Sequence, residues 1–394
     1  MRLTTFGFGA ILATAVAATC AKPAFAYKLY ASKYQVHEQM TERSAECFID
    51  SLRTGKPVQD CSSLALGNGL RHATDSQPVG DFRVEGVPAT FGALTTAVRW
   101  PDDPQRKLVT LTGMANFGLA FEAAKYCRSY SGLGVQYAGL LCASHFGSMQ
   151  FLHAMASDAT ETAGETQTKI LEWSRFAYDY AIGRLQDDVG LCDALRSYPS
   201  IREALVGSDD SYICTGNDEY RPRTVGQLFG FQCRNIVSSA VCWIIPSTRD
   251  RRIAALGAIL HVIQDSYSQA HAQRGGCSAG ASVIRRQAVE RFLNYAEQDS
   301  GKHAQADAWP IVDVVADPAI EHPIVAGAQV LSFFSKGADA GELANYLRQS
   351  VLGVPTASQE KAGPGECYIK EETFPQYEHL AARSYRNRQR NALE

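Results

Sequence analysis

Apolar residues recur at helical spacing along most of this chain, whereas runs that alternate apolar and polar residues are few and short. This periodicity predicts a mainly α fold. We expect helices over residues 38–53, 168–185, 251–270, 284–308 and 338–352. Residues 55–105 are richer in Gly, Pro and Asp, so we expect them to form a loop with little regular structure.

The first 26 residues have the pattern of a secretory signal. Arg2 supplies the positive charge, residues 6–18 form an apolar stretch, and Ala24-Phe25-Ala26 has the small-x-small form of a cleavage site. The apolar run is shorter than the roughly 20 residues that a transmembrane helix requires, although an uncleaved anchor stays an alternative. We therefore expect cleavage before Tyr27 and a secreted or periplasmic protein.

Cysteine usage agrees with export. The chain has 11 Cys, and removal of the signal takes away Cys20 and leaves an even number. An even number in an exported chain predicts disulfides. Sequential neighbours would close short loops, each contributing about 2–4 kcal/mol, although the sequence does not fix the pairing. These pairs are 47 with 61, 127 with 142, 192 with 214 and 233 with 242, and residues 190–250 are expected to be a disulfide-tied excursion.

Charge and composition exclude some functions. Of the 394 residues 45% are apolar, which is ample for a buried core. The net charge of −3 does not favour a protein that binds nucleic acid by neutralising phosphates, so we expect no stable nucleic-acid complex. The chain also lacks a G-x-S-x-G elbow, a phosphate-binding P-loop and an H-E-x-x-H motif.

Two His/Asp pairs remain as candidates for chemistry. His261 and Asp265 are four residues apart on an expected helix, and His303 and Asp307 repeat this spacing. Side chains at i and i+4 project to one side of a helix and can bind the same ion, such as Zn²⁺. Core histidines beside surface acids are the alternative reading of either pair alone. Two pairs in one chain favour the metal site.

The spacing H-x3-D-x5-H from His261 to His271 resembles the signature of the zinc-dependent phospholipase C family, which also resembles the S1/P1-type nucleases. In that family the signature lies on a core helix and supplies ligands to a cluster of three zinc ions. The resemblance implies that His261 and Asp265 bind the first zinc, with Asp265 also bridging to a third. His271 would bind the second zinc, together with His303 and Asp307.

The amino terminus extends this resemblance. In the phospholipases the mature terminus ligates zinc together with a His about three helical turns further on. Here Tyr27 is the expected first residue and His37 lies ten positions later, so the resemblance implies that both bind zinc. A free α-amine suits this role because its low pKa lets it lose its proton near neutral pH. Val262 and Gln269 stand where the family often has Tyr and Pro.

The first zinc would need one more carboxylate and one more His. The turn Arg99–Pro104 resembles the Asp-bearing loop of the family, and it offers Asp103, with Asp102 as the alternative. We expect Asp103 to be a ligand and also the base that takes a proton from the attacking water. The segment Ser144–Gly147 resembles the His-Phe segment of the family, so His145 is the expected ligand and His153 the alternative.

The resemblance implies a phospholipase C that releases diacylglycerol and a phosphorylated head group, with up to three Zn²⁺ ions as cofactors. A phospholipid or another phosphodiester would be the substrate, and membrane contact would be peripheral, through an apolar loop near Leu228, Phe229 and Phe231. A single-strand nuclease and a non-catalytic, disulfide-stapled binding protein are the alternatives. We expect a signal peptide over 1–26, the phosphodiesterase-like helical domain over 27–310 and a helical extension packed on it over 311–394.

Overall fold

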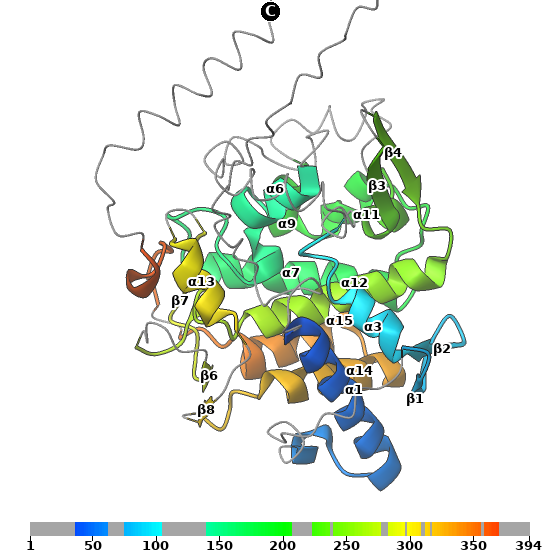
Figure 1. Ribbon diagram of the computed structural model, residues 1–394, viewed down its shortest axis with the longest axis horizontal. Coiled ribbons are helices and arrows are strands. Elements are labelled where there is room, and N and C mark those ends of the chain that lie inside the picture. Colours follow the sequence, from blue (N-terminus) through cyan, green and yellow to red (C-terminus); the bar gives the residue numbers. More distant parts are fainter. Residues whose placement is uncertain are drawn as a thin grey trace, which may run out of the picture.

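The computed structural model describes residues 36–61, 75–104, 139–206, 223–236, 239–276, 283–295, 298–308, 312–315, 317–355 and 358–369. Tyr27, the expected signal peptide and the tail beyond residue 369 lie outside these ranges. Within them the fold is mainly helical, as the sequence predicts (Figure 1). None of the described helices has both the length and the apolar character that crossing a bilayer requires.

One helix, α12 (Thr248–Asp265), forms the centre of the fold. It begins after Ser247, whose side chain accepts a hydrogen bond from the backbone of Asp250. Every residue from Ile253 to Asp265 is buried, which is the pattern of a helix surrounded by protein. Helices that pack against it are α1 (Val36–Thr54), α3 (Phe91–Ala97), α7 (Ala163–Ala181), α11 (Val225–Gly230) and α14 (Pro323–Lys336).

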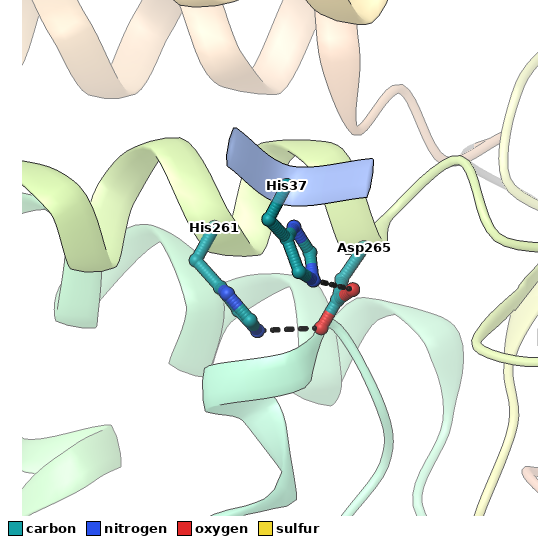
Figure 2. Close-up of side chains that lie close together, drawn as sticks. All are labelled: His37, His261 and Asp265. Atoms are coloured by element: carbon teal, nitrogen blue, oxygen red, sulfur yellow. Dashed lines mark ion pairs between the residues drawn. The ribbon is translucent and has the colours of Figure 1, made fainter. Parts of the chain in front are cut away.

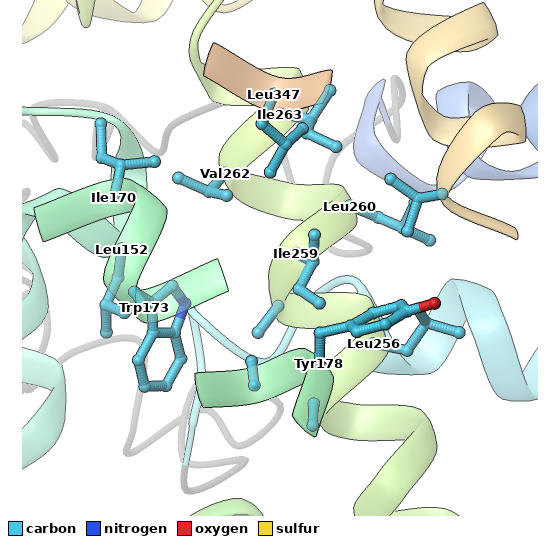
Figure 3. Close-up of a cluster of buried hydrophobic side chains, with 14 of the residues drawn as sticks. Leu152, Ile170, Trp173, Tyr178, Leu256, Ile259, Leu260, Val262, Ile263 and Leu347 are labelled. Atoms are coloured by element: carbon cyan, nitrogen blue, oxygen red, sulfur yellow. The ribbon is translucent and has the colours of Figure 1, made fainter. Parts of the chain in front are cut away.

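The apolar core gathers around α12 (Figure 3). Trp173 on α7 and Leu256 and Ile259 on α12 are all fully buried. The helix α7 starts with a capping box, in which the Thr162 side chain and Glu165 satisfy each other's backbone N–H groups. Close packing on all sides therefore leaves the polar residues of α12 inside the protein, where they need polar partners.

Shorter helices and turns complete the helical part. They are η1 (Val58–Cys61), α6 (Gly139–Phe146), η2 (Gln150–His153), α8 (Leu191–Ala194), η3 (Leu195–Ser197), α9 (Pro199–Val206), α13 (Ser300–Ala306), α15 (Ala340–Tyr346), the π-turn η4 (Leu347–Val351) and η5 (Glu366–Tyr368). The predicted helices over 38–53, 168–185, 251–270 and 338–352 correspond to α1, α7, α12 and α15 with η4.

Strands in the described residues form two-stranded sheets only. Three sheets are antiparallel and one, β6 with β8, is parallel. The antiparallel pairs are β1 (Pro78–Val84) with β2 (Val87–Thr90), β3 (Phe231–Ile236) with β4 (Ser239–Ile244), and β5 (Ala272–Gln273) with β7 (Arg291–Phe292). The parallel pair is β6 (Val283–Arg286) with β8 (Val312–Val315).

The prediction of a loop over residues 55–105 was wrong, because β1, β2 and α3 lie there. Val79, Phe82 and Val84 on β1 are buried, but they do not follow a simple alternation. The register of the hairpin shifts between Pro78 and Arg83, and Gly80 has a φ of 50°. This irregularity resembles a β-bulge, and it hides the period of two in the sequence.

The prediction of one helix over residues 284–308 was also wrong. Among the described residues of this range only α13 is helical, and it starts where the Asp299 side chain accepts hydrogen bonds from the backbone of Gly301 and Lys302. The preceding residues form β6 and β7, so Ile284 and Phe292 are buried through sheet pairing rather than on one helix face. The secondary structure of this segment is set by pairing with distant strands, which cannot be read from its own sequence.

The cysteine predictions are confirmed for one pair. Cys47 and Cys61 form a disulfide that joins α1 to η1. Cys192 is also disulfide-bonded, but its expected partner Cys214 lies outside the described residues, as does Cys127. Cys233 and Cys242 stand directly opposite each other in the β3–β4 register.

The predicted apolar loop for membrane contact was wrong at two of its residues. Leu228 and Phe229 are buried, and the Phe229 ring stacks on Tyr180. The side chain of Phe231 lies outside the described part of the structure. Exposed apolar side chains occur nearby instead, at Trp243 and Ile244 on β4.

Candidate metal centre

Buried His and Asp side chains from distant parts of the chain converge at the carboxyl end of α12. They form three groups, and within each group the candidate ligand atoms lie within 4.8 Å of one another. No member of these groups is more than 2% exposed. The groups are His37, His261 and Asp265; Asp102, His153 and His261; and His271, His303 and Asp307.

Asp265 is the centre of the first group (Figure 2). Its Oδ2 lies 2.9 Å from Nε2 of His261, one helical turn earlier on α12. Its Oδ1 lies 3.3 Å from Nε2 of His37, which the first turn of α1 supplies. The two imidazole rings stack with their centroids 4.0 Å apart. The i, i+4 pair predicted from the sequence is therefore real, and α1 adds the second His.

The second group shares His261 with the first. Nε2 of His261 lies 3.0 Å from Nδ1 of His153, which is the last residue of η2. The same Nδ1 lies 3.0 Å from Oδ2 of Asp265 and 3.8 Å from Oδ1 of Asp102. Asp102 follows α3 and also lies 3.8 Å from Nε2 of His37. The first and second groups thus adjoin and use both oxygens of Asp265.

The third group lies on the other side of Asp265. Nε2 of His303 is 2.8 Å from Oδ2 of Asp307, the residue after α13, and 3.2 Å from Nε2 of His271. Nε2 of His271 is 3.6 Å from Oδ1 of Asp307, and its Nδ1 is 3.5 Å from Oδ2 of Asp265. Because α12 ends at Asp265, the chain turns and brings His271 back between the groups. Asp265 therefore borders all three.

Asp102 and His153, the alternatives that the sequence offers, belong to the second group, whereas Asp103 and His145 belong to none of the three. Asp103 is buried next to Asp102, but it belongs to none of the three groups. His145 lies at the edge of the centre, with Nε2 3.9 Å from Oδ1 of Asp102 and its ring 4.4 Å from that of His153. Adjacent residues in a turn point in different directions, which the sequence alone does not resolve.

Hydrogen bonds to Nδ1 fix how the first two histidines point. Nδ1 of His37 donates to Oε1 of Gln264 at 2.7 Å, and Nε2 of Gln264 donates to Thr41 at 3.0 Å. Nδ1 of His261 donates to the Val98 carbonyl at 2.8 Å. With the proton held on Nδ1, Nε2 of each ring is a lone-pair donor that faces Asp265.

The same pattern holds in the third group. Nδ1 of His271 donates to the His153 carbonyl at 2.6 Å, and Nδ1 of His303 donates to Oε1 of Gln298 at 2.6 Å. Nε2 of Gln298 donates in turn to the Ala270 carbonyl at 2.9 Å. Neither of these supporting glutamines is among the residues predicted from the sequence. Gln264 could have been found, because it lies among apolar residues directly before Asp265 on the core helix.

Burial and mutual charge set the protonation of the centre. Burial raises the pKa of Asp102 well above its usual value, and the nearby carboxylate of Asp265 adds to this. Burial also acts to raise the pKa of Asp265, but the surrounding histidines, His261 first, outweigh it and hold that pKa well below its usual value. Burial lowers the pKa of His153 and of His261 to about 4, so both rings are neutral at pH 7.

His271 behaves differently. Burial acts to lower its pKa, but the carboxylates of Asp265 and Asp307 outweigh burial and raise the pKa to about 9. In the metal-free protein His271 is therefore an imidazolium between two carboxylates at neutral pH. An ion that binds through this ring has to displace its proton, which makes metal binding depend on pH.

The polar atoms left without partners fit a cation. Neither oxygen of Asp102 accepts a hydrogen bond from the described residues, and neither does Oδ1 of Asp265. Buried carboxylate oxygens are costly unless a donor or a metal ion satisfies them. Imidazole nitrogens and carboxylate oxygens are the ligands of Zn²⁺ sites. The donor set thus fits up to three ions, with Tyr27 outside the described residues.

Comparison with known proteins adds no relative. The chain matches no family model, no curated protein and no solved structure. What it does must be inferred from the His/Asp centre itself and from the fold that holds it.

Proposed function

We propose that the protein is an exported zinc-dependent phosphodiesterase, and specifically a phospholipase C with a zinc-phospholipase-C-like helical fold. The observation that carries the proposal is the position of Asp265, whose carboxylate adjoins His261, His37, His153 and His271. A carboxylate shared by adjoining His/Asp groups is what a cluster of closely spaced ions requires. One isolated structural zinc would need four ligands and no shared carboxylate.

The residues of the centre suit hydrolysis of a phosphodiester. Zinc ions bound there would lower the pKa of water from about 15.7 to about 7 and offset negative charge developing on the phosphate. The histidines and carboxylates of the three groups would hold the ions. Hydrogen bonds at Nδ1 orient the rings of His37, His261, His271 and His303 before any substrate arrives. Asp102 replaces Asp103 as the proposed base, because its oxygens accept no hydrogen bond from the described residues.

A phospholipid is the proposed substrate. The H-x3-D-x5-H spacing resembles that of the phospholipases, and a net charge of −3 gives no general attraction for a polynucleotide. Trp243 is 44% exposed and Ile244 is 38% exposed on β4, and they replace Leu228 and Phe229 as the side chains for peripheral membrane contact. Tryptophan favours membrane interfaces because its ring is apolar and its N–H is polar.

The test combines metal content with two substrates. The purified mature protein is loaded with zinc and its metal content is measured by mass spectrometry. Head-group release from mixed phospholipid micelles is then compared with release of acid-soluble nucleotides from single-stranded DNA. We expect two to three zinc ions per chain and turnover of phospholipid. Nucleotide release without lipid turnover would identify a nuclease instead, and absence of bound zinc would contradict the metal centre.

Substitution of the shared carboxylate makes the test specific. Asp265→Asn is expected to lower zinc affinity and turnover by more than about 100-fold, since even an indirect supporting residue is worth 10–100-fold in affinity. Asp250→Asn is the matched control, because Asp250 lies on the same helix with a half-exposed side chain. A folded Asp265→Asn protein with full zinc occupancy and normal turnover would show that the His/Asp pair is structural.

A further inference from the structure

The helices α12 and α3 pack against each other at Gly257. A Cβ atom placed on Gly257 would lie 2.2 Å from the carbonyl carbon of Ala97 and 2.4 Å from its oxygen. Real Cβ atoms essentially never come within 3.0 Å of other heavy atoms. Here the atoms in the way are the backbone carbonyl of Ala97, which cannot rotate away as a flexible side chain could. The absence of a side chain at Gly257 is therefore what allows the end of α3 to lie against α12.

This contact lies directly beside the metal centre. Gly257 and His261 are four residues apart on α12, so they share one face of the helix. Val98 follows Ala97, and its carbonyl accepts the hydrogen bond from Nδ1 of His261 at 2.8 Å. The close approach at Gly257 thus brings the acceptor within reach of the ring that it orients.

The same segment leads to Asp102. The backbone of Trp100 donates to the Ala97 carbonyl at 2.9 Å, and the backbone of Asp103 donates to the Arg99 carbonyl at 2.9 Å. These bonds make residues 97–103 a tight turn that continues from α3. A shift of Ala97 away from α12 would therefore carry both the Val98 carbonyl and Asp102 with it.

We propose that Gly257 is a positioning residue for the metal centre. Gly257 lets the Val98 carbonyl reach and orient His261, and it holds the turn that carries Asp102 in place. The proposal rests on the proposed function in one respect, which is that the centre binds zinc. The group of His271, His303 and Asp307 takes no ligand from α3 or from its following turn. Loss of the close approach should therefore weaken binding at the two groups that contain His261 and spare the group of His271, His303 and Asp307.

The test uses Gly257→Ala and two measurements. Zinc titration should show binding weakened by about 10–100-fold at the groups that contain His261, which is the usual effect of losing an outer-shell partner. Zinc at His271, His303 and Asp307 should bind as before. In the metal-free protein, histidine nitrogen NMR should show a slowly exchanging proton on Nδ1 of His261 that the variant loses. His261→Gln assigns that signal. The NMR measurement needs no metal, so it tests the placement of His261 even if the protein binds no zinc.

Matched variants separate this effect from general packing damage. Gly164→Ala on α7 meets no atom within 4 Å. Gly327→Ala on α14 meets Oγ of Ser44 at 2.4 Å and Cδ2 of Leu260 at 3.6 Å, and neither residue belongs to a ligand group. Both should keep the zinc affinity and the His261 signal. If Gly257→Ala does not fold, Ala97→Val enlarges the same contact from α3 and should act in the same direction. The proposal is overturned if the Nδ1 proton and zinc affinity survive in both variants, or if Gly327→Ala loses them equally.

Discussion

Oδ1 of Asp102 lies 3.8 Å from Nδ1 of His153, and both side chains are buried. Asp103 follows Asp102 in the chain but belongs to no group of candidate ligands. We therefore expect Asp102→Asn to lower zinc affinity at one site by more than about 100-fold, and Asp103→Asn to leave it within a few-fold of the native value. Zinc titration of the two variants decides between them. The reverse order of effects would restore Asp103 as the ligand.

An ion pair connects two of the segments that supply ligands. Nε of Arg99 donates to Oε1 of Glu38 at 2.5 Å, and Glu38 is buried directly after His37. Replacing one partner leaves the charged group of the other without its hydrogen-bond partner and with little access to water. Glu38→Gln and Arg99→Met should therefore each lower the free energy of unfolding by about 1–3 kcal/mol. The double variant should lose less than the sum of the two. Urea denaturation of all three gives the coupling, and simple additivity would show that the pair contributes nothing.

Acid should destabilise the protein through His322. Burial lowers the pKa of His322 to about 3, and the charges of Arg286 and Arg43 act in the same direction. An unfolded His has a pKa of about 6.5, so between these values the unfolded chain binds a proton that the folded protein does not. The contribution of His322 to the free energy of unfolding is therefore complete above pH 6.5. It falls by about 1.4 kcal/mol for each pH unit below that value, down to the folded pKa.

The variant His322→Asn tests this pH dependence. The side chain of His322 caps α14 by accepting from the backbone of Ile324, and Asn is a favoured residue at that position. The variant should match the native protein at pH 7 and lose less stability at pH 5, as measured by urea denaturation at both pH values. An unchanged loss at pH 5 would mean that other groups carry the acid sensitivity.

The disulfide between Cys47 and Cys61 should stabilise the end of α1. It closes a loop with a sequence separation of 14, for which chain entropy predicts about 3 kcal/mol. The double variant Cys47→Ala/Cys61→Ala should therefore have a free energy of unfolding that is lower by that amount, as measured by urea denaturation. Zinc affinity should stay unchanged, because His37 lies at the opposite end of α1. A parallel loss of zinc would show that the whole helix has moved.

The sequence predicts those parts of the fold that depend on local periodicity. The helices α1, α7 and α12 follow from apolar spacing, and the i, i+4 geometry of His261 and Asp265 follows from the helix itself. The strand β1 was missed because a register shift between Pro78 and Arg83 breaks its alternation. A local irregularity removes the period on which such predictions depend.

The remaining ligands depend on contacts between distant segments. His145 and His153 both lie close to Asp102, and only the packing of η2 against α12 decides which ring faces His261. The neighbouring acids Asp102 and Asp103 differ in the same way, because the turn after α3 directs one of them into the centre. Gly257 is a further example, because its close contact with Ala97 comes from the packing of α3 on α12 and cannot be predicted from the sequence around either residue.

The hydrogen bonds at Nδ1 of His37, His261, His271 and His303 have a thermodynamic consequence. Each ring loses its rotational freedom when the chain folds. The entropy cost of ordering these side chains therefore belongs to folding and not to metal binding. Folding and metal capture are thereby separated into two steps. The backbone should be nearly the same with and without metal, and the speed of zinc exchange should depend on the path through the protein rather than on refolding.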